Sequence, residues 1–106
     1  MPDSYEKPVT EEELIARAKK GRVSLEELNK SIASEHYYNP GELHPLTICV
    51  LKLANGFMVV GHSAPAMKEN FDEAIGRRLA RERCISQVWQ LMGYALREKI
   101  YQEEEK

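Results

Sequence analysis

The 106-residue sequence has few of the features that mark exported, membrane-spanning or disulfide-linked proteins. It contains two cysteines, which are too far apart to suggest a disulfide framework. No apolar run approaches the roughly 20 residues that a membrane-spanning helix needs. The first residues are polar and acidic, unlike those of a signal peptide. These absences favour a reducing compartment, and we expect a cytoplasmic protein that does not engage a membrane.

Positive charge is not in excess either. The sequence has 15 Lys and Arg against 17 Asp and Glu, a formal net charge of -2, which does not favour nucleic acid as a partner. It also lacks a Gly-rich phosphate loop, paired acidic motifs of the hydrolase type and a Ser-His-Asp order suited to nucleophilic catalysis. We therefore expect a protein that is not an enzyme and that uses no cofactor.

The rest of the composition is ordinary for one soluble domain, with 42% hydrophobic and 30% charged residues. We expect a flexible arm over residues 1–9, which contain two prolines, and a single α+β domain over residues 10–106. Capping boxes that begin at Thr10 and Ser24 predict helices within residues 10–35. These helices are expected either to cover a sheet or to form an arm that binds a partner.

The strongest local signal predicts a β-hairpin over residues 46–63, where Asn55-Gly56 separates two runs of β-forming residues. A two-residue turn would place Leu51 opposite Val60, and both faces of the ribbon would then be largely apolar. One face would carry Cys49, Leu51, Leu53, Met58 and Val60, and the other Ile48, Val50, Phe57 and Val59. Because an isolated hairpin is barely stable and one helix covers one face, the second face needs the N-terminal helices or another copy of the chain.

A long C-terminal helix is expected over residues 70–101, with Asn70 as its N-cap. Its apolar residues recur with a helical period, so it would pack on the hairpin. Small side chains line one of its faces, including Gly76 and Ala80, and would let another backbone approach closely. The expected fold is therefore α+β, with N-terminal helices, a two-stranded antiparallel hairpin and this helix. The residues expected to meet in a homo-oligomer are Ile48, Val50, Phe57, Val59, Gly76 and Ala80.

Arginines near the start of the last helix form the candidate anion site. Guanidinium groups and free backbone N–H groups at a helix start both suit phosphate, and tyrosines in the preceding loop would stack on a base if they fold nearby. The candidate ligand-binding residues are Arg77, Arg78, Arg81, Asn70, Tyr37 and Tyr38. The alternative is a solvated face on which these arginines pair with neighbouring acidic residues.

Cys49 and His62 would be cross-strand neighbours in the predicted register, so they are the candidate start of a metal site. A structural zinc site usually has four ligands, however, and neither a CxxC nor an HxxxH spacing is present. The same two side chains would make a Cys-His nucleophile pair, but no third residue is evident to orient it. We expect neither a metal site nor a catalytic pair.

The sequence contains NGF, then G-x-S-A, then ENFD, followed by single Gly, Ala and Trp positions and a final GY. This pattern resembles a family of short tailed-phage and prophage proteins known from podoviruses of the N-four and Sf-six types, over about the C-terminal 60 residues. His62, Cys84 and Gln90 depart from the usual pattern. The resemblance implies a phage accessory protein that acts in the infected bacterium, against host defence or in host takeover. It names no ligand.

Two functions therefore stand side by side. The first is an oligomeric binding protein that counters host defence by sequestering a small anionic ligand of the nucleotide type or by occupying a host protein. The second is a protein-interaction module that masks a host factor through the hairpin edge or the N-terminal helices. DNA binding by the last helix is a third idea, and the net charge opposes it.

Overall fold

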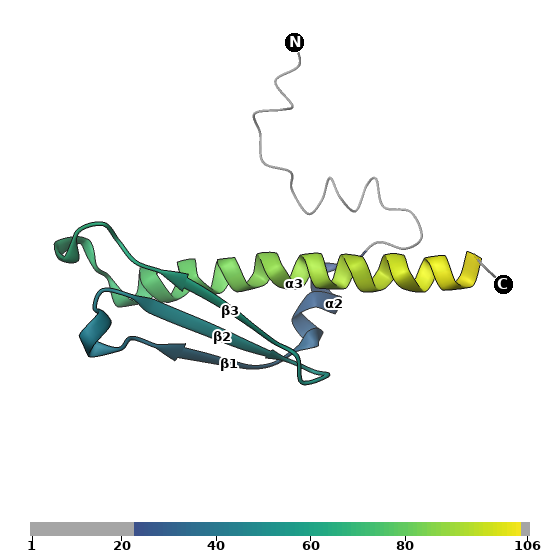
Figure 1. Ribbon diagram of the computed structural model, residues 1–106, viewed down its shortest axis with the longest axis horizontal. Helices are drawn as coiled ribbons and strands as arrows, with labels where there is room; N and C mark the ends of the chain where they lie inside the picture. Colours follow the sequence, from purple (N-terminus) through teal and green to yellow (C-terminus); the bar gives the residue numbers. More distant parts are fainter. Residues whose placement is uncertain (1–22, 105–106) are drawn as a thin grey trace, which may run out of the picture.

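The computed structural model describes residues 23–104, so the predicted arm and the first predicted helix lie outside the described residues. The three strands form one antiparallel sheet in the order β1-β2-β3, and a long helix packs on it (Figure 1). The α+β class is confirmed, but the sheet has three strands where two were predicted. The elements are α2 (Leu25–Ser31), β1 (Ile32–Tyr38), η2 (Gly41–Leu43), β2 (Thr47–Leu53), β3 (Met58–Ser63), η3 (Lys68–Asn70) and α3 (Glu73–Glu104).

Strand β1 occupies residues that were predicted as the end of a helix and the start of a loop. The predicted cap of the preceding helix is present, since Ser24 Oγ accepts the N–H of Glu27 at 3.1 Å. That helix stops at Ser31, and the chain then pairs with β2 in an antiparallel register that sets Tyr37 opposite Cys49. The helix prediction was wrong beyond Ser31 because this pairing gives partners to backbone groups on the edge of β2.

The hairpin turn has three residues where two were predicted. The N–H of Gly56 donates to the carbonyl of Leu53 at 2.9 Å, and the N–H of Leu53 donates to the carbonyl of Phe57 at 2.8 Å. Gly56 has φ +92°, and no described non-glycine residue has a positive φ. The turn is therefore a type I turn closed by a glycine bulge. Asn55 instead uses its side chain, whose Oδ1 accepts the N–H of Phe57 at 2.9 Å.

The extra turn residue shifts the strand register by one position. Leu51 lies opposite Val59, and Val50 lies opposite Val60. Because side chains alternate between faces, the shift exchanges the predicted faces of β3. Val59 is 4% exposed on the face toward α3, and Val60 is 54% exposed on the other face. The predicted placement of Val60 beside Leu51 was wrong.

Helix α3 begins three residues later than predicted, and its N-cap is Asp72. The carboxylate of Asp72 accepts the N–H of Ile75 at 3.1 Å, while Asn70 ends the short helix η3. The helix then runs without interruption through Gly93 to Glu104. At 1.5 Å per residue it is about 48 Å long, about twice the length of the strands, so its second half extends beyond the sheet (Figure 1).

The core lies between α3 and one face of the sheet, where two glycines allow close approach. A Cβ on Gly61 would lie 2.5 Å from the carbonyl oxygen of Ala80, and one on Gly76 would lie 2.8 Å from Thr47 Oγ1. The buried hydrophobic residues are Leu28, Cys49, Leu51, Leu53, Val59, Ala80, Cys84 and Val88. The small residues of α3 therefore bring the helix against its own sheet.

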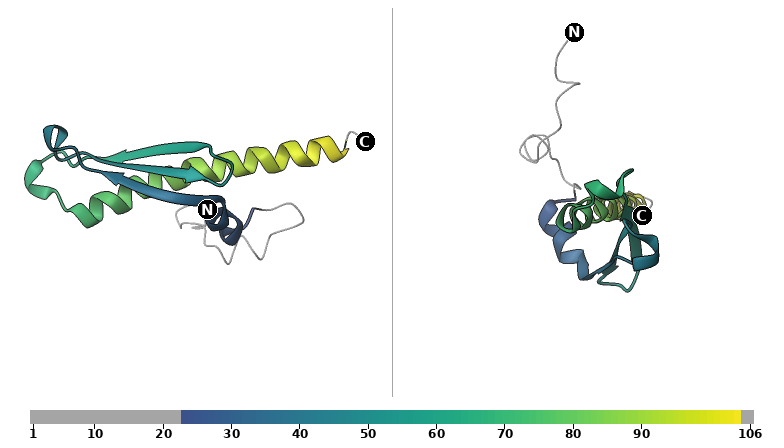
Figure 2. Two further views of the ribbon diagram at one scale, coloured as in Figure 1. Left: turned by 90° about the horizontal axis from the view of Figure 1, so that it is seen from below. Right: turned by 90° about the vertical axis from the view of Figure 1, so that its left-hand side faces the viewer.

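The opposite face of the sheet stays open in the part of the chain from residue 23 to residue 104 (Figure 2). We call it the outer face. All three strands contribute residues to it: Ser34, His36 and Tyr38 from β1, Ile48, Val50 and Lys52 from β2, and Met58, Val60 and His62 from β3. Met58 is 60% exposed, so apolar side chains of this mixed surface face solvent in the single chain. Over the same residues no helix combines the length and apolarity needed to cross a membrane.

Candidate functional site

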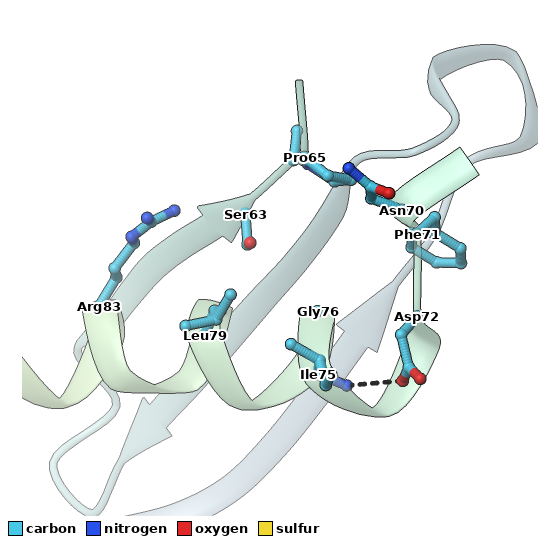
Figure 3. Close-up of a pocket in the computed structure, with 10 residues that line it drawn as sticks. Ser63, Pro65, Asn70, Phe71, Asp72, Ile75, Gly76, Leu79 and Arg83 are labelled. Atoms are coloured by element: carbon cyan, nitrogen blue, oxygen red, sulfur yellow. Dashed lines mark hydrogen bonds between the residues drawn. The ribbon is translucent and has the colours of Figure 1, made fainter. Parts of the chain in front are cut away.

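A pocket of about 180 Å³ lies where β3 ends and α3 begins (Figure 3). Ser63 reaches it from the last position of β3, Asn70 and Phe71 from the loop before α3, and Arg83 from the third turn of the helix. Its remaining lining residues are Ala64, Pro65, Asp72, Ile75, Gly76 and Leu79. The pocket thus combines an apolar floor with a hydroxyl, an amide, a guanidinium group and the carboxylate of Asp72. The first three are hydrogen-bonding groups suited to an anionic ligand, and the carboxylate is held by the N–H of Ile75.

The helix amino end beside this pocket is already capped. Asp72 uses its carboxylate to accept the N–H of Ile75, so the negative charge that a helix start favours comes from the chain itself. The ring of Phe71 packs edge-on against His44, with 4.7 Å between centroids. Binding of an anion here must therefore depend on Arg83 and Asn70 more than on the helix dipole.

Arg83 and Gln87 also cover the outer edge of β3. A guanidinium nitrogen of Arg83 donates to the carbonyl of His62, and Gln87 Nε2 donates to the carbonyl of Val60 at 2.6 Å. Both acceptors lie on the strand edge that faces away from β2. Together with the pairing of β2 to β1, these bonds occupy the hairpin edges that were predicted to bind a host factor.

A second polar cluster joins β1 to the other side of α3. Arg81 makes two hydrogen bonds to the Glu35 carboxylate, 3.0 Å from Nε to Oε1 and 3.2 Å from Nη2 to Oε2. The hydroxyl of Tyr37 donates to the same carboxylate at 2.8 Å. Arg77 lies over the Tyr37 ring at 5.6 Å and pairs with Glu73 at 2.8 Å. The charges of both arginines are therefore matched within the chain.

The ionisation of this cluster follows from its contacts. The hydrogen bond from Arg81 lowers the pKa of Glu35, although partial burial opposes the shift. Burial and the bond to Glu35 raise the pKa of Tyr37, and the bond to Glu35 raises the pKa of Arg81. At neutral pH the cluster is thus a charged pair with a neutral tyrosine, and it fastens the edge strand to the helix.

The Glu35–Arg81 pair gives a prediction for pH dependence. Because its folded-state pKa is lowered, ionised Glu35 stabilises the fold above its ordinary value of 4.5, and this stabilisation is lost as pH falls through the lower value. We expect Glu35→Gln to reduce the free energy of unfolding at pH 7 by less than about 1 kcal/mol, since both side chains are partly solvated. Urea unfolding should show this difference shrinking as the pH is lowered below 4.5.

The exposed Glu42→Gln variant is the control for the pH experiment, because Glu42 lies in η2, away from the cluster. It should leave the pH dependence as in the wild type. Equal pH profiles for the wild type and Glu35→Gln would contradict the role of the pair.

The structure divides the predicted ligand-binding residues among four places. Tyr37, Arg77 and Arg81 come together in the polar cluster, as the anion-site hypothesis required, but beside Glu35 and Glu73. Asn70 lies at the pocket, on the opposite side of α3. Arg78 is exposed on α3, and Tyr38 pairs with Ile48 on the outer face. These residues therefore do not form one site.

The predicted oligomer interface is divided in a similar way. Ile48 and Val50 do lie on the outer face, and Phe57 is exposed directly after the turn. Val59, Gly76 and Ala80 instead pack in the core between the sheet and α3. These last three residues contact their own chain, so the interface prediction was wrong for them. The cause for Val59 is the shifted register, and for the other two the close packing of α3.

The predicted proximity of Cys49 and His62 was also wrong, because the register puts them on opposite faces. Cys49 is fully buried toward α3, where the thiol of Cys84 donates to its carbonyl at 3.2 Å. Burial raises the pKa of Cys84 to about 12. Neither thiol is reactive in this setting. Within residues 23–104, no three His, Cys, Asp or Glu side chains gather as a metal site would require.

Sequence reasoning missed Ser63 and Arg83 as pocket residues and Glu35 as a partner of Arg81. Ser63 and Asn70 both belong to the motif pattern, but that they lie at one pocket is visible only in the structure. Arg83 sits beside other arginines on α3, and only its position on the β3 side of the helix distinguishes it. Glu35 had no signal, because its segment was assigned to a helix.

Comparison with known proteins gives one family. The model of the phage protein (N4 Gp49/phage Sf6 gene 66) family matches residues 23–100, from the start of α2 to nearly the end of α3. No curated protein and no solved structure matches the chain. Three residues of the motif pattern have structural roles. Gly56 provides the positive φ of the turn, Asp72 is the N-cap of α3, and Gly61 lets α3 pack closely on β3. By this match the chain belongs to the N4 Gp49/phage Sf6 gene 66 family of phage proteins.

Proposed function

We propose that this phage-family protein is a non-enzymatic binding protein that acts in the cytoplasm of the infected bacterium and counters host defence by holding a small anionic ligand of the nucleotide type. The observation that supports the proposal most is the pocket at the start of α3. It joins the guanidinium of Arg83, the amide of Asn70 and the hydroxyl of Ser63 around an apolar floor. A few convergent polar groups in an apolar pocket are typical of ligand sites.

The pocket is a better candidate than the arginine cluster that the sequence suggested. Arg81 is engaged by both oxygens of Glu35, and Arg77 by Glu73. An incoming phosphate would have to displace these carboxylates from the same guanidinium groups. Arg83, in contrast, donates to a neutral carbonyl, that of His62, so its charge is not neutralised by that bond. A phosphate would gain a charge-assisted hydrogen bond from it.

The size of the pocket limits what it holds. Its volume of about 180 Å³ is below the range of roughly 300–1,000 Å³ that is usual for small-molecule sites. We propose that it takes the phosphate end of the ligand, and that the rest lies over the loop that contains Phe71 or against another copy of the chain. Small subunits often complete their ligand sites with a neighbouring copy.

Isothermal titration calorimetry of the full chain with a panel of cyclic nucleotides tests the proposal. At least one member should bind, and Arg83→Ala should weaken its affinity by about 10-fold or more, the loss expected for a hydrogen bond to a charged group. Arg78→Ala is the matched control, because Arg78 is exposed on the same helix and does not line the pocket. No heat across the panel would contradict the nucleotide proposal.

A second variant locates the site if binding is seen. Arg81→Ala should leave the affinity unchanged, because its guanidinium belongs to the cluster on the β1 side of α3. Binding that is lost in Arg81→Ala and kept in Arg83→Ala would move the site to that cluster. Thermal unfolding of each variant shows whether the loss of binding heat in calorimetry results from unfolding of the variant.

The second half of α3 favours a different candidate function, the masking of a host protein. Trp89 and Met92 still pack against the core, but Tyr94 beyond them is 71% exposed. Tyr101 is also exposed on this part of the helix, and exposed aromatic residues are frequent anchors of protein interfaces. A pull-down from bacterial lysate should then recover a protein with the wild type and lose it with Tyr94→Glu. Recovery of the bait alone would remove this candidate.

A further inference from the structure

An open, mostly apolar groove of about 350 Å³ lies on the second half of α3. Four of its lining residues follow one another along the helix at intervals of four, three and four positions: Trp89, Gly93, Leu96 and Ile100. These intervals are the ones that repeat along the seam between two packed helices. Gly93 brings no side chain to the middle of the row, which leaves room above the helix there. The groove therefore suits a helix as its occupant.

The chain itself meets the groove at Val23. Val23 is the first described residue, it lines the groove, and α2, which follows it, packs against α3. The helix predicted from the capping box at Thr10 comes directly before it, with Gly21 as its expected end. Only Gly21 and Arg22 thus separate this predicted helix from a residue that lies at the groove. Residues 105–106, at the other end of the chain, are too few to form a helix.

The predicted helix matches the groove in its length and in its apolar face. Residues 11–20 would span about 15 Å as an α-helix, and the stretch of α3 that lines the groove spans about 17 Å. Leu14, Ile15 and Ala18 would share one face of the predicted helix. A helix this short is only marginally stable alone in water, so it needs an apolar surface to cover that face.

We propose that residues 10–20 form a helix that packs in the groove of its own chain, antiparallel to α3. Leu14 then lies against Leu96, and Ala18 lies nearer to Trp89. The packing removes the apolar face of the short helix and the row on α3 from water together. An alanine methyl at Gly93 would leave most of the groove open, so the packing does not require a glycine at that position.

Charge selects the antiparallel direction. The predicted helix begins with three glutamates, residues 11–13, and ends with Lys19 and Lys20. Arg97 lines the groove, and its pairing with Glu104 at 3.6 Å is largely exposed to solvent. The antiparallel direction brings the glutamates toward Arg97, whereas the parallel direction would bring the two lysines there. Exposed ion pairs contribute little stability, so the apolar contact holds the helix and the charges set its direction.

The inference gives the first predicted helix a place that the sequence left open. That helix was expected either to cover the sheet or to bind a partner, and the groove places it on α3 instead. The groove shares no residue with the ligand pocket, so the inference goes beyond the proposed function, and each of the two can fail alone.

Fluorescence of the full chain tests the inference, because Trp89 is the single tryptophan and lines the groove. Ala18→Glu should shift its emission to longer wavelength, increase its quenching by acrylamide and lower the helical signal in circular dichroism. Ala16→Glu is the matched control, since the same substitution then falls on the opposite side of the predicted helix. It should give the wild-type emission and quenching. Equal quenching of the wild type and Ala18→Glu would overturn the proposal.

Cysteine cross-linking tests the position of the helix and the identity of its host chain. Leu14→Cys combined with Leu96→Cys should form a disulfide within one chain under mild oxidation, whereas Ala16→Cys combined with Leu96→Cys should not. The native Cys49 and Cys84 are buried and do not interfere. A disulfide between two chains, seen as a band of doubled mass on a non-reducing gel, would show that the groove takes a second copy and would overturn the proposal. The absence of any disulfide in the Leu14 and Leu96 pair would overturn it as well.

Discussion

Replacement of Gly61 by alanine is expected to lower the free energy of unfolding by about 3 kcal/mol, the upper part of the usual range for overpacking. The added Cβ would lie 2.5 Å from the carbonyl oxygen of Ala80 and 2.9 Å from the backbone nitrogen of Cys84. Both atoms belong to the helix backbone, so no side chain can rotate away to relieve the contact. The whole of α3 would have to move outward from the sheet, and the core would lose contacts along the helix.

Gly93→Ala is the matched control for this prediction. Gly93 lies on α3, and apart from its chain neighbours and the adjoining helix backbone no described atom lies within 4 Å of where its Cβ would be. Alanine is a better helix former than glycine, so this variant should gain about 0.5–1 kcal/mol. Urea unfolding of both variants and the wild type gives the comparison. A loss of under 1 kcal/mol for Gly61→Ala would mean that the helix does not approach β3 as described.

The second large effect is expected from Val59→Asp, which should lower the free energy of unfolding by about 3–5 kcal/mol, because it leaves an unpaired charge in the core. Val59 is 4% exposed and packs beneath α3. This loss approaches the whole stability of a small domain, which is typically about 5–15 kcal/mol. We expect the variant to be largely unfolded by circular dichroism at 37 °C.

The adjacent Val60→Asp is the matched control, since Val60 is 54% exposed on the outer face. It should change the stability of the single chain by less than about 1 kcal/mol. The measurement is made at low protein concentration, where self-association contributes little to stability. A larger loss of stability for Val60→Asp than for Val59→Asp would instead support the two-residue turn, because the register of that turn places Val60 in the core and Val59 outside.

The hairpin and the long helix could be predicted from local signals, but their details depended on choices that the sequence leaves open. Asn55-Gly56 suits both a two-residue turn with two positive φ angles and a three-residue turn with one. The chain adopts the second, in which only Gly56 has a positive φ. Asn70 and Asp72 are both good N-caps, and the choice of Asp72 is visible only in its bond to Ile75.

Strand β1 could not be predicted because its residues give no strong strand pattern. Its side chains are only partly buried, and its polar residue Glu35 lies on the helix face, where Arg81 matches it. That match is tertiary, since the two residues are 46 positions apart. The predicted ligand site was not found as one group of residues for the same reason. The sequence places the arginines correctly on one helix. Only the packed structure shows which acidic residues pair with them and which side of the helix each arginine faces.

The central claim is that a small anionic ligand binds at the end of β3 and the start of α3. The most direct test is an NMR titration of the ¹⁵N-labelled full chain with the nucleotide that binds in calorimetry. We predict that the largest shift changes fall on the backbone amides of Ser63, Asn70 and Phe71 and on the side chain of Arg83. Changes confined to Tyr37, Arg77 and Arg81, with none around the pocket, would contradict the claim.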